Sequence, residues 1–125
     1  DEQWIVNRGN KIDLWQGYEK QLWDGIKIIN IGGHFPGSCI LHVSSLSENV
    51  NVFCGDTFNI SPSLKHISVM YSYPNRIPLS IKEIKRIKIL VEKINFDTLY
   101  GFYSYQNLEK KAKNILMKSL DLYLK

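Results

Sequence analysis

The sequence predicts an α+β domain in which an antiparallel or mixed sheet is followed by two helices. Short β-branched runs, separated by glycine, asparagine and proline turns, fill the first half of the chain. Apolar residues at helical spacing, with lysines between them, mark the second half. The 125 residues, of which 44% are hydrophobic, are enough for one domain with a core. We assign residues 1–125 to this single domain, with residues 1–21 as a poorly defined lead-in.

Two β-hairpins are predicted in the first half. Residues 20–23 and 26–31 flank Asp24-Gly25, a hairpin signal, and should pair antiparallel. Residues 39–43 and 50–54 flank a polar turn and should form the second hairpin. Prolines interrupt residues 57–79, so we expect loops there, with one extended piece at residues 68–73.

Two helices and one strand are predicted in the second half. Ser80 and Glu83 form a capping box for a helix that ends near Asn95. Its apolar stripe comprises Ile81, Ile84, Ile87, Val91 and Ile94. Residues 96–100 form a short buried strand, and Asn107 caps the last helix. The apolar face of that helix comprises Leu108, Ala112, Ile115, Leu116 and Leu122.

The charge pattern favours solvated helix faces over a binding surface. Net charge is +4, and the lysines lie mostly within residues 82–93 and 110–125. Neither a basic surface interleaved with aromatics nor a membrane-length apolar run occurs, so we expect no nucleic acid and no membrane as partners. The apolar surroundings of Cys39 and Cys54 favour buried free thiols in a reducing cytoplasm over a disulfide, although both cysteines could lie on neighbouring strands. The chain begins without methionine, so we expect a fragment or a processed product.

Two of the predicted strands end in turns that present a metal-capable side chain. The first turn is Gly32-Gly33-His34-Phe35-Pro36-Gly37-Ser38, and the second is Gly55-Asp56-Thr57. An imidazole and a carboxylate together suit Zn²⁺, Mn²⁺ or iron. A lone histidine in a turn is more often structural, and Gly-Asp-Thr is a common turn, so only the two turns together indicate a metal site.

Taken together, the two turns resemble the C-terminal half of the metallo-β-lactamase-fold hydrolases. Those proteins carry a G-H-T-P-G-S-type turn and a G-D-T/S turn about 20 residues apart, and His34 and Asp56 are 22 residues apart. The resemblance runs from about residue 22 to the end. It implies half of an αββα sandwich, with His34 as the third metal histidine and Asp56 as the bridging aspartate. The implied chemistry is zinc-dependent hydrolysis of ester, thioester, lactone or β-lactam bonds.

The chain departs from the family pattern at two places. The first metal motif, H-x-H-x-D-H, does not occur, and His42 and His66 are too isolated to supply it. Phe102 stands where the family usually has its last metal histidine. The segments Ser68–Asn75 (SVMYSYPN), Ile77-Pro78-Leu79 and Leu99-Tyr100-Gly101 resemble a branch of the family that also lacks that histidine.

Two functions follow from these patterns. In the first, the chain is part of a zinc hydrolase that acts on small molecules. By itself the chain would be inactive, because the two ligands that match the family pattern would hold zinc only weakly. The second is a non-catalytic, metal-poor structural or binding module that oligomerises. Half of a sandwich would expose one sheet face, so we expect a partner, either a missing N-terminal half or a second copy. Tyr71 and Tyr73 are candidate substrate-binding residues of a lid, or they simply alternate inward and outward on a local strand.

Overall fold

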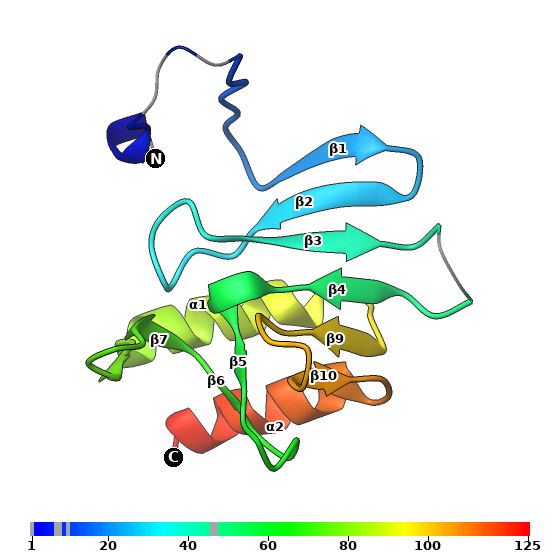
Figure 1. Ribbon diagram of the computed structural model, residues 1–125. Coiled ribbons are helices and arrows are strands. Elements are labelled where there is room, and N and C mark those ends of the chain that lie inside the picture. Colours follow the sequence, from blue (N-terminus) through cyan, green and yellow to red (C-terminus); the bar gives the residue numbers. More distant parts are fainter. Residues whose placement is uncertain (1, 7–8, 10, 46–47) are drawn as a thin grey trace.

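A six-stranded mixed sheet forms the centre of the protein. The computed structural model describes residues 2–6, 9, 11–45 and 48–125. The strand order is β1 (Glu19–Trp23), β2 (Ile26–Asn30), β3 (Cys39–Val43), β4 (Asn51–Phe53), β9 (Thr98–Tyr100) and β10 (Asn107–Leu108) (Figure 1). Neighbouring strands are antiparallel except β4 and β9, which are parallel. Both predicted hairpins, β1–β2 and β3–β4, are confirmed.

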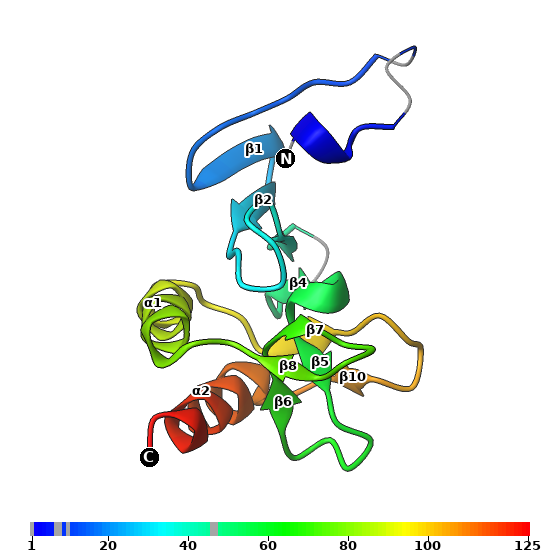
Figure 2. The same cartoon turned by 90° about the vertical axis from the view of Figure 1, so that its left-hand side faces the viewer.

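Two α-helices cover one face of this sheet. Helices α1 (Ile81–Glu92) and α2 (Ala112–Tyr123) lie on the same side of the strands (Figure 2). The strand residues that point toward them are almost fully buried, among them Ile29, Ile40, Val52 and Leu99. The prediction of an α+β protein with a mixed sheet followed by two helices is therefore confirmed. None of the helices in the described part of the chain is long and apolar enough to span a membrane.

The segment predicted as loop-rich contains two small hairpins. Strand β5 (Asn59–Ile60) pairs with β6 (Ile67–Ser68), and β7 (Met70–Ser72) pairs with β8 (Ile77–Pro78). Two short 3-10 helices, η1 (Glu2–Trp4) and η2 (Gly55–Thr57), complete the structure. Strands of two or three residues are too short for side-chain alternation to reveal them. The expected extended piece at residues 68–73 corresponds to the end of β6 together with β7.

The prediction placed the start of the last helix too early in the chain. Asn107 does not cap a helix, because Asn107 and Leu108 form β10 opposite Tyr100 and Leu99. Leu108 is buried in the core from this strand, and α2 begins only at Ala112, after Lys111 at φ 58°. The apolar face is also shifted, since Leu122 is exposed whereas Leu120 is fully buried.

The predicted capping box of α1 forms only in part. The Ser80 hydroxyl accepts a hydrogen bond from the Glu83 amide at 3.3 Å, as expected. The Glu83 carboxylate accepts hydrogen bonds from Arg86 rather than closing the box on the Ser80 amide. Ile81, placed on the apolar stripe by its spacing, is exposed, whereas Ile84, Ile87 and Val91 are buried. Cys39 and Cys54 are both free thiols, as the sequence favoured.

Candidate functional site

His34 lies in a tight loop that follows β2. The Ser38 carbonyl accepts hydrogen bonds from the amides of Ile31 and Gly32, at 3.0 and 2.9 Å, and so closes the loop at its base. Gly32 and Gly33 have φ of 66° and 86°, a left-handed conformation that favours glycine. The glycine pair therefore reverses the chain immediately before the histidine, as the sequence indicated. The His34 side chain is about 20% exposed.

Asp56 lies in η2, the single turn that follows β4. Gly55 opens this turn at φ 49°, and the Thr57 amide donates to the Cys54 carbonyl at 3.0 Å. The Asp56 carboxylate is 54% exposed. The carboxylate oxygens of Asp56 are therefore accessible to a cation from solvent.

Strand direction brings the two turns together. Strands β2 and β4 are both antiparallel to β3, so their carboxyl ends lie at the same edge of the sheet. Figure 1 shows the arrowheads of β2, β4 and β9 at this edge, beside η2 and β7. The His34 Nε2 and the Asp56 Oδ2 are 3.9 Å apart. Two ligand atoms on one tetrahedral zinc are about 3.4 Å apart, so this pair needs little movement to share an ion.

The His34 ring is held on its other side by backbone and aromatic groups. Its Nδ1 lies 3.3 Å from the Met70 carbonyl oxygen. Since a carbonyl can only accept, Nδ1 carries the proton, and Nε2 turns toward Asp56. A backbone carbonyl on one imidazole nitrogen is the usual partner of a histidine whose other nitrogen binds a metal. The ring of Tyr73 lies 5.1 Å away and that of Phe35 5.7 Å away, between ring centres.

The two predicted tyrosines have different positions. Tyr73 packs against His34, and its hydroxyl donates a 2.6 Å hydrogen bond to the Asp56 carbonyl. Burial, together with the nearby Asp56 charge, raises the pKa of Tyr73. Tyr71 is exposed on β7 and lines a surface pocket of about 470 Å³ with Phe35, Pro36 and Arg86. Tyr71 thus lines the pocket beside the His34 loop, whereas Tyr73 contacts both His34 and Asp56.

No third candidate ligand joins His34 and Asp56 among the described residues. In that part of the chain no three His, Cys, Asp or Glu side chains are grouped to hold a metal ion. Phe102 follows β9 at the same sheet edge and is 64% exposed. His42 is directed to the Asn95 carbonyl, and the ring of His66 lies beside Tyr123. The contacts of these two histidines are thus with Asn95 and Tyr123 rather than with the His34–Asp56 pair.

Cys54 is close to the site but is chemically unsuited to it. The thiol is buried, and its sulfur lies 3.3 Å from each of the carbonyl oxygens of Phe58 and Tyr100, to either of which its one proton can be donated. Burial raises the pKa of Cys54 to about 12. The thiolate that a metal requires is therefore strongly disfavoured here.

Three side chains at the site, from Ser38, Thr57 and Arg86, were not given a role in the sequence analysis. Ser38 and Thr57 join the two turns through a 2.7 Å hydrogen bond between their buried hydroxyls. Arg86 reaches from α1 to the Ile31 carbonyl at 2.8 Å. The three-residue spacing between Glu83 and Arg86 could have indicated an ion pair on α1, but not its contact with the loop.

Fold and site together define an α+β protein with a histidine–aspartate pair at the carboxyl edge of a mixed sheet. No family model and no solved structure matches the chain. The chain is similar to the uncharacterized protein YmaE of Bacillus subtilis (strain 168), with 30% identity over 126 residues. The match covers all of this chain and 46% of the relative, so the chain spans about half the relative's length.

Proposed function

We propose that this chain is the C-terminal, metal-site-bearing part of a zinc-dependent hydrolase of the metallo-β-lactamase fold. The observation that carries the proposal is the 3.9 Å approach of His34 Nε2 to Asp56 Oδ2 at the edge where β2 and β4 end. The Met70 carbonyl on Nδ1 supports it further, because that contact leaves Nε2 free to bind. The substrates would be small molecules with an ester, thioester, lactone or β-lactam bond.

The residues present fit part of a zinc site. His34 and Asp56 would hold the ion, and the remaining ligands would come from outside the described residues or from water. A bound zinc would polarise a carbonyl and lower the pKa of a coordinated water. Tyr73 would keep both ligands in place, and Tyr71 would contact substrate at the neighbouring pocket. With two ligands only, we expect the chain by itself to be inactive.

Titration of the purified chain with zinc, with the heat of binding measured by calorimetry, tests the proposal. We expect weak binding that His34→Ala and Asp56→Asn abolish, because each removes one of two ligands. His66→Ala is the matched control, since His66 lies beside Tyr123 rather than Asp56. Elemental analysis after dialysis should find well under one zinc per chain. Binding that survives His34→Ala, or tight stoichiometric zinc, would overturn the proposed ligand set.

A second function, a metal-poor module that oligomerises, is favoured by one feature of the sheet. On the face away from the helices, Ile28, Leu41, Phe53 and Tyr100 form one cross-strand row and are all partly exposed. Phe53 and Tyr100 stack with ring centres 4.7 Å apart. We name these four residues the apolar row. In a longer chain an N-terminal half would cover it, whereas in this chain alone a second copy would do so.

A further inference from the structure

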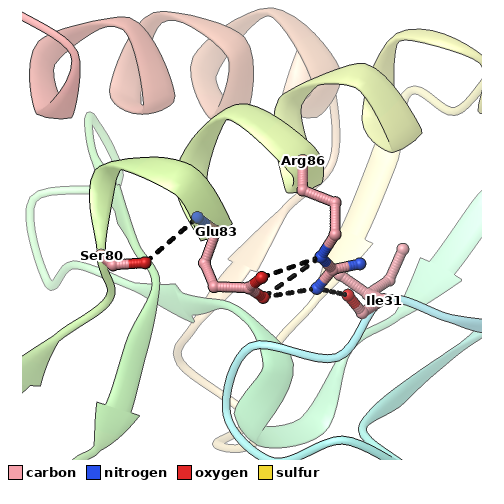
Figure 3. Close-up of polar contacts among 4 residues, drawn as sticks. All are labelled: Ile31, Ser80, Glu83 and Arg86. Atoms are coloured by element: carbon pink, nitrogen blue, oxygen red, sulfur yellow. Dashed lines mark hydrogen bonds and ion pairs between the residues drawn. The ribbon is translucent and has the colours of Figure 1, made fainter.

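Arg86 connects helix α1 to the loop that carries His34. Its Nη2 donates a 2.8 Å hydrogen bond to the carbonyl of Ile31, the residue after β2 (Figure 3). Gly32, Gly33 and His34 follow directly in the chain. The guanidinium therefore fixes the point from which the loop departs.

Glu83 holds the guanidinium in this position. Its carboxylate accepts from Arg86 Nε at 3.1 Å and from Nη2 at 2.8 Å, a two-point contact that sets the plane of the arginine head (Figure 3). Glu83 lies in the first turn of α1, where the Ser80 hydroxyl accepts from its amide. The cap of the helix, the carboxylate and the guanidinium thus form one continuous path to the Ile31 carbonyl.

The glycine pair makes this close approach possible. A Cβ on Gly32 would lie 2.8 Å from Arg86 Nη2, and the glycine already has a left-handed φ. A Cβ on Gly33 would lie 3.0 Å from Ile87 Cδ1 and 3.1 Å from Leu79 Cδ1. Helix α1 therefore packs directly on the loop, and only glycine leaves room at this point for the Arg86 head group as it lies here.

We propose that Arg86, held by Glu83, is a positioning residue that sets where the His34 ring lies relative to Asp56. Arg86 does not touch the two candidate ligands; it acts through the Ile31 carbonyl and the glycine pair. The consequence for metal binding rests on the proposed function, but the effect on the ring position does not. A lysine could reach the Ile31 carbonyl as a point charge, yet could not also make the two-point contact with Glu83.

The test compares Arg86→Met with Lys88→Met by nuclear magnetic resonance of the metal-free full chain. Lys88 is the matched control, because it makes a comparable ion pair from the same helix, to Asp121, away from the loop. We expect Arg86→Met to shift the amide signals of Gly32, Gly33 and His34 and to weaken the nuclear Overhauser contacts between the His34 and Tyr73 rings. Lys88→Met should leave these signals unchanged. Arg86→Lys should fall between wild type and Arg86→Met.

Zinc titration of the same variants adds a second readout. We expect about tenfold weaker zinc binding in Arg86→Met, as for other residues that orient a metal ligand indirectly, and no change in Lys88→Met. Unchanged ring contacts in Arg86→Met would overturn the positioning role, whatever happens to zinc. If Arg86→Met does not fold, the amide signals and ring contacts of Arg86→Lys decide whether Arg86 positions the His34 ring. A wild-type chain that binds no zinc would instead refute the proposed function, and the ring contacts would still decide the role of Arg86.

Discussion

At the scale of single residues, two hydroxyl groups keep the His34 loop and the Asp56 turn together. The Thr57 hydroxyl donates to the Cys39 carbonyl at 3.1 Å, so its only proton is used there. The Ser38 hydroxyl must then be the donor in the 2.7 Å contact with Thr57. Both side chains are buried, at 3% and 4% exposure, so water cannot replace either partner. This pair links the end of the His34 loop to the residue after Asp56.

Replacing Thr57 with valine tests this link. The change keeps the shape of the side chain but leaves the Ser38 hydroxyl and the Cys39 carbonyl without their buried partner. We expect a loss of about 1–3 kcal/mol in the free energy of unfolding, measured by urea denaturation. The Ser38→Ala, Thr57→Val double variant should lose less than the sum of the single losses, because the unsatisfied hydroxyl is gone. Strictly additive losses would show that the two hydroxyls do not act together.

At the scale of elements, helix α1 has two duties. Its buried stripe of Ile84, Ile87 and Val91 packs on the sheet. Arg86, held by Glu83 of the first turn, contacts the loop after β2. Hydrogen bonds from Arg86 lower the pKa of the Glu83 carboxyl below its ordinary value of 4.5. A carboxylate with a lowered pKa stabilises the fold at neutral pH, and that contribution is lost as the pH falls through the lowered value.

The pH dependence of stability should therefore change in Glu83→Gln. Between about pH 6 and pH 3, wild type should lose more stability than this variant, because the variant has no carboxylate to protonate. The difference should stay below about 1 kcal/mol, since the pair is half-exposed and screened by water. Urea denaturation followed by tryptophan fluorescence at both pH values measures it. Glu109→Gln is the control, an exposed carboxylate whose side chain has no ion pair within the described ranges. If the stability of Glu83→Gln had the same pH dependence as that of wild type, the Glu83 carboxylate would not be the group responsible.

Local patterns explain which elements could be predicted. Strand β3 follows from an apolar run beside a polar turn, and helix α1 from its periodicity and the Ser80 cap, all of which are properties of neighbouring residues. The error at Asn107 has a long-range cause, because Leu108 pairs with Leu99 across the sheet and no nearby residue signals that pairing. In the same way, glycines at strand ends pointed to His34 and Asp56. The Ser38–Thr57 and Arg86–Ile31 contacts depend on tertiary packing, which the sequence does not display.

At the scale of the whole molecule, the two faces of the sheet differ in how they are covered. One face lies under α1 and α2, and no α-helix in the described ranges lies on the other (Figure 2). The apolar row, Ile28, Leu41, Phe53 and Tyr100, crosses four strands on that second face. Exposed apolar patches of this kind mark surfaces that associate. The relative is about twice as long as this chain, so it has additional sequence that could cover a surface of this kind.

For the 125-residue chain alone, we expect the apolar row to drive self-association. Phe53 is central in the row and 41% exposed, so Phe53→Ser should remove much of the apolar contact without opening the core. Sedimentation velocity should show wild type as a dimer or larger species and Phe53→Ser shifted toward monomer. Ile89→Ser is the matched control, because Ile89 is an exposed apolar residue on α1, which lies on the other side of the sheet. It should sediment like wild type. A monomeric wild type would contradict the expected self-association, and dissociation by both variants would place the interface outside the apolar row.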